Sequence, residues 1–272
     1  MKLAGKVAIV TGTSPNIGGG MAEALAAEGA AIVAVDALAA NADDCAAAIR
    51  AAGGRAIGIT CDVMDEARVA AAVDRAVAEL GAVDILVNNA AIFNKKGVLD
   101  MSWDEWQRQS GIILGGAFLF TKYAARAMIA RGGGGVIVNV ISTAGHQGEP
   151  GNVAYSTSKG GLLNFTRSTA MELVGHGIRV VSLTPTATDP AEMFDRGRRW
   201  GRDTVMPDGL AALMGKFERR IPMQALPKPS DYGRALAFLV SDDAAMITGT
   251  DLRIDAGAVA RYWAWDPGAD EN

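Results

Sequence analysis

Seven short apolar runs recur along the 272-residue chain and alternate with longer alanine-rich stretches. The runs cover residues 7–10, 31–35, 56–60, 84–88, 136–141, 178–183 and 250–255. Most are almost continuously apolar, which is typical of strands buried on both faces of a sheet. The stretches between them have the length and composition of helices. The alternation predicts an α/β fold with a Rossmann-type doubly wound parallel sheet between two layers of helices, three layers in all.

The pattern continues without a linker, so we interpret residues 1–260 as a single domain. Residues 190–229 interrupt the rhythm with prolines, methionines and four arginines between positions 196 and 202. We interpret this segment as a substrate-binding insertion or lid, and a solvated surface insertion is the alternative. The arginines either attract an anionic substrate or form a solvated face. In the C-terminal tail, residues 261–272, three aromatic residues suggest docking on the domain or on a neighbouring subunit: Tyr262, Trp263 and Trp265.

Composition narrows the class of protein. Half of the residues are hydrophobic, enough for a full core, and the net charge of −4 speaks against nucleic-acid binding. No apolar stretch approaches the roughly 20 residues of a membrane-spanning helix. The first residues do not follow a signal-peptide pattern, so a cytoplasmic location is expected. The two cysteines and two histidines lack metal-site spacing, so no metal is predicted; they are Cys45, Cys61, His146 and His176.

A glycine-containing turn, TGTSPNIG, follows the first apolar run and opens a helix-like stretch. The free amides and dipole of a helix N-terminus favour a pyrophosphate there. Gly12 allows the tight turn, Gly18 allows close approach of helix and sheet, and Ser14 and Ile17 complete the candidate loop. Asn16 stands where a further glycine is expected. Asparagine tolerates a positive φ, so we expect the loop to bind a dinucleotide still, at some backbone cost.

Asp36 ends the second apolar run. A carboxylate there accepts hydrogen bonds from the adenosine ribose hydroxyls and repels a 2′-phosphate. No arginine or lysine lies in the loop or directly after Asp36, so we predict NAD(H) rather than NADP(H) as cofactor. A plain strand-end cap is the alternative role.

Tyr155 and Lys159 lie four residues apart, on one face of a helix-like stretch. An ammonium beside a phenol favours the phenolate and lowers the pKa of the phenol from about 10 toward neutrality. Such a tyrosine exchanges a proton with an alcohol or carbonyl oxygen. Ser142 follows the run 136–141 and is placed to hydrogen-bond the same oxygen, because sites on open α/β sheets lie at the carboxyl ends of strands.

Together these motifs resemble the short-chain dehydrogenase/reductase family, over most of the chain from Lys6 to Gly257. The resemblance also rests on CDV (61–63), NNAA (88–91), YSTSK (155–159) and ITGTDLRIDAG (247–257). It implies a Rossmann-type fold, hydride transfer with a nicotinamide cofactor, and a homotetramer or dimer.

The resemblance also implies a role for individual residues. Tyr155 is implied as acid and base, Lys159 as its partner and a ligand of the nicotinamide ribose, and Ser142 as the group that orients the substrate oxygen. The residues implied on the adenosine side of the cofactor are Asp62, Val63 and Asn89.

Two further positions depart from the family's pattern. Ile113 stands where the family usually has an asparagine that holds a water in a proton relay to the lysine. Isoleucine cannot hydrogen-bond, so the relay is expected to take another route or to run slowly. Pro185 and Thr186 replace a usual Pro-Gly pair, and we expect Thr188 to contact the cofactor carboxamide through its backbone.

The sequence therefore predicts an NAD(H)-dependent enzyme that interconverts a secondary alcohol and a ketone. The methionines and aromatic residues of the insertion favour an apolar, cyclic or aromatic substrate. One alternative is a 3-oxoacyl-type reductase, and another is a catalytically silent NAD(H)-binding sensor or scaffold. The expected partners are the small-molecule substrate and further copies of the chain, with neither nucleic acid nor a membrane.

Overall fold

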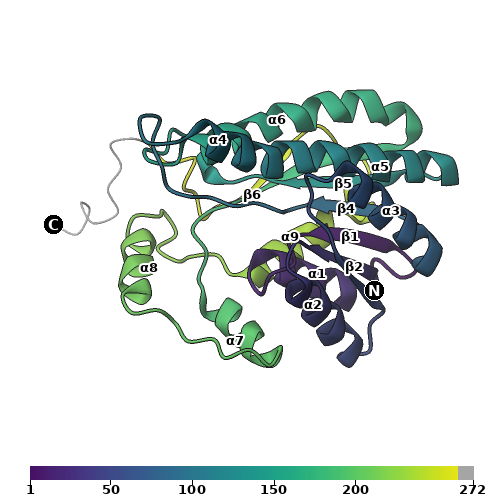
Figure 1. The fold of residues 1–272 in the computed structure, drawn as a ribbon, viewed down its shortest axis with the longest axis horizontal. Helices are drawn as coiled ribbons and strands as arrows, with labels where there is room; N and C mark the ends of the chain where they lie inside the picture. Colours follow the sequence, from purple (N-terminus) through teal and green to yellow (C-terminus); the bar gives the residue numbers. More distant parts are fainter. Residues whose placement is uncertain (263–272) are drawn as a thin grey trace.

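The computed structural model of the protein describes residues 1–262. Within this range, strands form one seven-stranded sheet in the order β3-β2-β1-β4-β5-β6-β7 (Figure 1). Their bounds are β1 Val7–Thr11, β2 Ala31–Asp36, β3 Ala56–Thr60, β4 Ile85–Asn88, β5 Gly135–Val140, β6 Ile178–Pro185 and β7 Asp251–Ile254. Every predicted run is a strand, and every pairing is parallel. The predicted fold class is confirmed.

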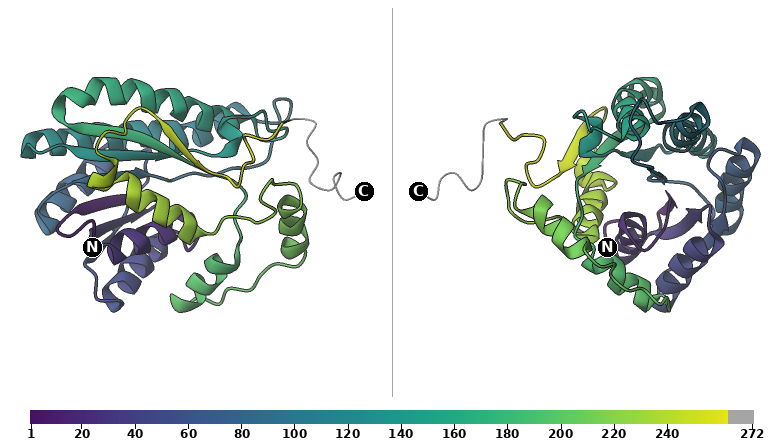
Figure 2. Two further views of the ribbon diagram at one scale, coloured as in Figure 1. Left: turned by 180° about the vertical axis from the view of Figure 1, so that it is seen from behind. Right: turned by 60° about the vertical axis from the view of Figure 1, so that its left-hand side comes forward.

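Helices cover both faces of the sheet (Figures 1 and 2). One face carries α1 Ile17–Ala27, α2 Ala39–Ala51 and α9 Pro229–Leu239; the other carries α3 Glu66–Leu80, α5 Gly116–Arg131 and α6 Val153–Leu173. A short helix, α4 Trp103–Ser110, leads through the π-helical turn Gly111–Gly115 into α5.

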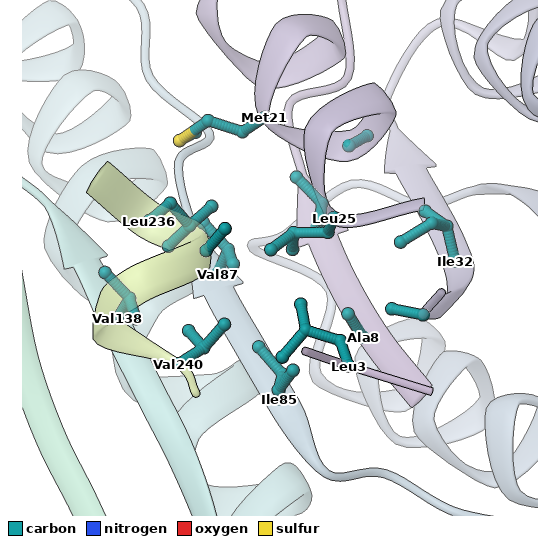
Figure 3. Close-up of a cluster of buried hydrophobic side chains, with 14 of the residues drawn as sticks. Leu3, Ala8, Met21, Leu25, Ile32, Ile85, Val87, Val138, Leu236 and Val240 are labelled. Atoms are coloured by element: carbon teal, nitrogen blue, oxygen red, sulfur yellow. The ribbon is translucent and has the colours of Figure 1, made fainter. Parts of the chain in front are cut away.

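Apolar clusters fill the space between the sheet and each helix layer. In Figure 3, Leu25 of α1 and Leu236 of α9 lie beside Val87 of β4, all of them in one buried cluster. On the opposite face, Phe120 of α5 packs in a second cluster with Ile137 of β5. Burial of each large side chain contributes about 1.5–3 kcal/mol to folding, which explains why the strands are apolar on both faces.

The helical run Trp103–Arg131 is, within residues 1–262, the one that is long and apolar enough to cross a membrane by length and composition. The expectation that no apolar stretch approaches the length of a membrane-spanning helix is therefore wrong for this run. Its side chains Ile113, Phe120 and Met128 are at most 2% exposed, and they belong to the apolar clusters on this side of the sheet. The run is therefore a core helix of the domain.

Two helices, α7 Ala191–Arg199 and α8 Leu210–Glu218, lie in the predicted insertion and stand apart from the sheet in Figure 1. The expectation that arginines 196–202 attract an anion or form a solvated face is wrong for two of them. Arg196 is 5% exposed and donates to Glu23, 173 positions away. Arg202 donates to Asp44, 158 positions away. Partners at such separations leave no local pattern in the sequence.

Asp84 ties three elements together just before β4. Its Oδ2 accepts from the amide of Val7 at 2.8 Å, and its Oδ1 accepts from the guanidinium of Arg131 on α5 at 2.5 Å. The Asp84 side chain is 6% exposed. A buried carboxylate therefore joins β1, β4 and α5 at the end of the sheet away from the candidate site.

Asp84→Ala is expected to lower the free energy of unfolding by about 1–3 kcal/mol, because the buried amide of Val7 loses its acceptor. Urea unfolding measures the change. Asp243→Ala is the matched control, since Asp243 pairs with Lys2 on the surface, and it should leave the unfolding midpoint almost unchanged. Equal losses in the two variants would contradict the role given to Asp84.

Candidate active site

The glycine-containing turn joins β1 to α1. At β1 the order of the strands reverses, because β2 lies on one side of β1 and β4 on the other. Gly12 has a φ of 71°, and a Cβ there would lie 2.9 Å from the Cα of Ala90. A Cβ on Gly18 would lie 2.0 Å from the carbonyl oxygen of Gly12. Only glycine fits at either position, in agreement with the turn and the close approach expected of them.

Asn16 does not adopt the positive φ that the sequence analysis anticipated. Its φ is −83° and its ψ is −136°, at the N-cap of α1. Gly12 provides the left-handed residue of the turn, so Asn16 is free of left-handed strain.

Two side-chain oxygens in this loop are buried without a hydrogen-bond partner among the described residues, Oγ1 of Thr13 and Oδ1 of Asn16. Buried polar atoms are normally hydrogen-bonded, and the first amides of α1 likewise lack partners within the helix. The phosphates of a dinucleotide can accept from the amides and from the Thr13 hydroxyl, and its ribose hydroxyls can donate to Oδ1 of Asn16. The loop therefore fits a dinucleotide.

Asn89, directly after β4, holds this loop in place. Its Nδ2 donates to the carbonyl oxygens of Thr11 at 3.0 Å and Gly12 at 2.9 Å. In return, Oγ1 of Thr11 accepts from the amides of Asn89 at 3.0 Å and Ala90 at 3.1 Å. The sequence analysis placed Asn89 beside the adenosine and did not anticipate this positioning role.

The other predicted cofactor residues follow the carboxyl ends of β2, β3 and β6. Oδ1 of Asp36 accepts from the amide of Leu38 at 3.0 Å, so this carboxylate does cap the end of the strand, the alternative role given to it above. Its second oxygen remains available as an acceptor. Asp62 forms a similar turn, and Val63 is buried. Oγ1 of Thr188 lies 3.1 Å from the hydroxyl of Tyr232. These residues share one edge of the sheet with the glycine turn.

The three predicted catalytic residues come together at the end of β5. The hydroxyl of Ser142 lies near enough to that of Tyr155 to affect its pKa, and it accepts from the amide of Ala144 at 3.2 Å. Lys159 lies one turn beyond Tyr155 on α6, with Nζ 5.7 Å from the centre of the tyrosine ring. This ammonium donates to the carbonyl of Val140 at 2.5 Å.

Burial governs the protonation of this cluster. It raises the pKa of Tyr155, and the nearby hydroxyl of Ser142 opposes this with a smaller effect. Burial lowers the pKa of Lys159 from 10.5 to about 7. The expectation that Lys159 brings the pKa of Tyr155 toward neutrality is wrong for this arrangement. Desolvation is the larger effect, and a lysine with a pKa near 7 carries only part of its charge at neutral pH.

Ile113 lies in the π-helical turn and is 2% exposed. It packs in an apolar cluster with Ile141 and Leu162, and Tyr155 lies against the same cluster. The surroundings of this position are therefore apolar. That the proton relay takes another route or runs slowly remains a prediction.

His146 follows the turn that Ser142 begins. The sequence analysis considered it as a substrate contact or a surface residue. Its Nε2 lies 3.0 Å from Oγ1 of Thr184 and 3.2 Å from the carboxylate of Asp251, with 16% of the side chain exposed. The histidine therefore fastens the serine turn to β6 and β7. Of the predicted tail aromatics, Trp263 and Trp265 lie outside the described residues.

Comparison with known proteins shows the class to which this fold and site belong. Residues 12–259 match the family described as Enoyl-(Acyl carrier protein) reductase. The chain belongs to the short-chain dehydrogenase/reductase family.

Two similar proteins and one similar crystal structure indicate the type of enzyme. The chain is similar to "Cis-4-hydroxycyclohexanecarboxylate dehydrogenase" of Sinomonas cyclohexanicum, with 40% identity over 94% of this chain and 97% of the relative. It is 38% identical to "D-threitol dehydrogenase" of Mycolicibacterium smegmatis, over 94% of each chain. A short-chain type dehydrogenase/reductase from Mycobacterium marinum has a similar crystal structure, with a TM-score of 0.83, 32% identity, and coverage of 96% and 97%. These relatives are dehydrogenases, which supports an oxidoreductase.

Lys159→Met is expected to stabilise the protein at pH 7, by on the order of 2–4 kcal/mol. The reason is that methionine removes an amine whose charged form is destabilised by burial. Between pH 7 and 10.5 the unfolded chain binds a proton at Lys159 that the folded protein lacks, so wild-type stability rises with pH in this window. The variant should lose that rise, measured by urea unfolding at several pH values. The exposed Lys216→Met is the control. A rise retained in Lys159→Met would contradict the assigned burial effect.

Proposed function

We propose that the protein is an NAD(H)-dependent dehydrogenase that interconverts a secondary alcohol and a ketone. The observation that carries this proposal is the placement of Ser142, Tyr155 and Lys159 together at the carboxyl end of β5, with Nζ of Lys159 5.7 Å from the centre of the Tyr155 ring. The same edge of the sheet carries the loop in which oxygens of Thr13 and Asn16 are buried without a partner in residues 1–262. Two hydroxyl groups suited to one substrate oxygen thus share an edge of the sheet with a loop suited to a dinucleotide.

The nicotinamide ring, when bound, supplies the acceptor or donor of the hydride. Ser142 holds the substrate oxygen by a hydrogen bond. The phenol of Tyr155 gives its proton to a carbonyl oxygen in reduction. In oxidation the phenol first loses its proton to solvent, and the phenolate then takes the proton of the alcohol. Burial raises the pKa of Tyr155, so the phenol is protonated at neutral pH and suited to donate. In oxidation, a protonated Lys159 favours the phenolate that must form.

The preferred cofactor follows from Asp36. Its carboxylate lies at the end of β2, and a 2′-phosphate placed there would meet a like charge. This supports NAD(H).

We infer the substrate class from an exposed aromatic ring beside Tyr155 and from exposed apolar side chains in the insertion. The ring of Phe93 lies 5.7 Å from that of Tyr155, yet Phe93 is 59% exposed. In the insertion, Met206, Leu213 and Phe217 are also at least 38% exposed. We propose an apolar, cyclic alcohol as substrate and residues 190–229 as the segment that covers it. The relative named for a hydroxycyclohexanecarboxylate supports a ring.

Family membership supports self-association, and we propose a homotetramer or a dimer in the cytoplasm. The continuous helical run of α4 and α5 exposes Trp103 and Phe118, at 68% and 51%, which supports a contact on that side. Apolar aromatic side chains are enriched at the centres of such interfaces.

Titration with NADH and, separately, NADPH tests the cofactor, followed by nicotinamide fluorescence. NADH should bind at least about tenfold more tightly, and Asp36→Ala should remove most of that preference, because the like charge is gone. Asp43→Ala, an exposed carboxylate on α2, is the control and should keep it. Tighter binding of NADPH by the wild type would favour the 3-oxoacyl-type reductase and contradict the role of Asp36.

Tyr155→Phe tests the reaction. The variant should bind NADH within about twofold of the wild type and lose about 100- to 10,000-fold in kcat, since the proton-transfer group is removed. Tyr123→Phe is the matched control, because its hydroxyl bonds Glu66 on the surface. Dinucleotide binding without turnover of any secondary alcohol by the wild type would favour the silent sensor instead.

A further inference from the structure

Helix α7 of the insertion is fastened to the glycine-containing loop by one buried side chain. The guanidinium of Arg196 donates from Nε to Glu23 of α1 at 2.9 Å. One of its terminal nitrogens donates to the carbonyl oxygen of Pro15 at 2.9 Å. The side chain is 6% exposed. Arg196 therefore links the insertion, α1 and the loop that precedes α1.

Glu23 also accepts hydrogen bonds from two residues at the C-terminal end of α7. It accepts from Nε1 of Trp200 at 3.2 Å and from Arg199 at 3.1 Å. Close packing accompanies these bonds, since a Cβ on Gly19 would lie 2.8 Å from the Trp200 ring. The end of α7 thus lies directly against the first turns of α1.

Arg202 makes a separate attachment to α2. It donates to the side chains of Asp44 and Asn41, each at 2.8 Å, and to the carbonyl of Ala40 at 2.9 Å. None of these contacts reaches residues 12–18. The stretch 196–202, at and beyond the end of α7, is therefore docked at two places, and the contact with the loop belongs to Arg196.

The contact with Pro15 has a geometric consequence. The carbonyl of Pro15 and the N–H of Asn16 belong to one planar trans peptide unit, in which they point in opposite directions. A guanidinium that holds the carbonyl oxygen therefore sets the direction of the Asn16 amide. Asn16 is also the N-cap of α1, and its Oδ1 is buried without a partner in the part of the chain that the structure describes. Arg196 thus orients Asn16, whose amide and Oδ1 are available to a ligand.

We propose that Arg196 is a positioning residue for the dinucleotide: by holding the Pro15 carbonyl, it keeps Asn16 and the start of α1 in the binding orientation. A side chain of the substrate-side insertion thereby sets the affinity for the cofactor. The inference rests on the proposed dinucleotide function. A planar guanidinium bonds a carboxylate and a carbonyl at once, which a lysine ammonium on its flexible stem does not reproduce in the same geometry.

The test measures the Kd for NADH, by fluorescence, and kcat with saturating alcohol and NAD. Arg196→Met should raise the Kd about tenfold or more, the size expected for a lost charge-assisted hydrogen bond. Its kcat at saturation should stay within about twofold, because Arg196 contacts neither Ser142 nor Tyr155. Arg202→Met is the matched control, since it loosens the same segment without touching the loop, and its Kd should stay within about twofold.

Arg196→Lys keeps a positive charge beside Glu23, so the variant should fold. It cannot bond Glu23 and the Pro15 carbonyl at the same time in the same geometry, so the Kd for NADH should still rise. It serves as the deciding variant if Arg196→Met fails to fold. A Kd unchanged in a folded Arg196 variant overturns the inference. Equal increases in the Arg196 and Arg202 variants also overturn it, because docking of the insertion alone would explain them. A wild type that binds neither NADH nor NADPH overturns both this inference and the proposed function, and the wild-type titration distinguishes that case.

Discussion

The side-chain amide of Asn89 holds the glycine-containing turn against the end of β4, and the rest of the site depends on that contact. Asn89 bonds the carbonyls of Thr11 and Gly12. Its neighbour Asn88 donates to Asn139 of β5 at 2.9 Å, and Asn139 donates to Thr166 of α6 at 3.0 Å. Buried hydrogen bonds thus join side chains of β4, β5 and α6, the helix that carries Tyr155 and Lys159. Such bonds are strong in a low dielectric, although Oδ1 of Asn88 has no partner among the described residues.

The opposite side of the loop is held by the insertion. Arg196 bonds Pro15 from α7, while Asn89 bonds Gly12 from β4. The loop is therefore fixed between the sheet and the segment that we propose covers the substrate. In the cluster of Ser142, Tyr155 and Lys159, burial has a larger effect than hydrogen bonding. Lys159 is buried with a backbone carbonyl as its partner, and its pKa is lowered to about 7. In the proposed function, hydrogen bonds hold the loop that binds the dinucleotide, and desolvation sets the pKa values of Tyr155 and Lys159.

The fold could be predicted because parallel strands buried on both faces leave continuous apolar runs, and each of those runs is a strand. Ser142, Tyr155 and Lys159 could be brought together because parallel topology gathers strand ends at one edge. Three expectations did not hold, each for a physical reason. The φ of Asn16 depends on where the turn places its left-handed residue, which is Gly12. The pKa of Tyr155 depends on burial, which composition does not reveal. Arg196 has its partners 173 and 181 positions away, far beyond any local pattern.

The central claim is that this site moves a hydride between a secondary alcohol and NAD. Incubation with NAD and a cyclohexanol deuterated at its carbinol carbon tests it most directly, followed by NMR of the reduced nucleotide. The account predicts deuterium at C4 of the nicotinamide and a ketone formed in equal amount. Reduced nucleotide without deuterium, or no reduction with any ring alcohol despite tight NADH binding, would contradict it.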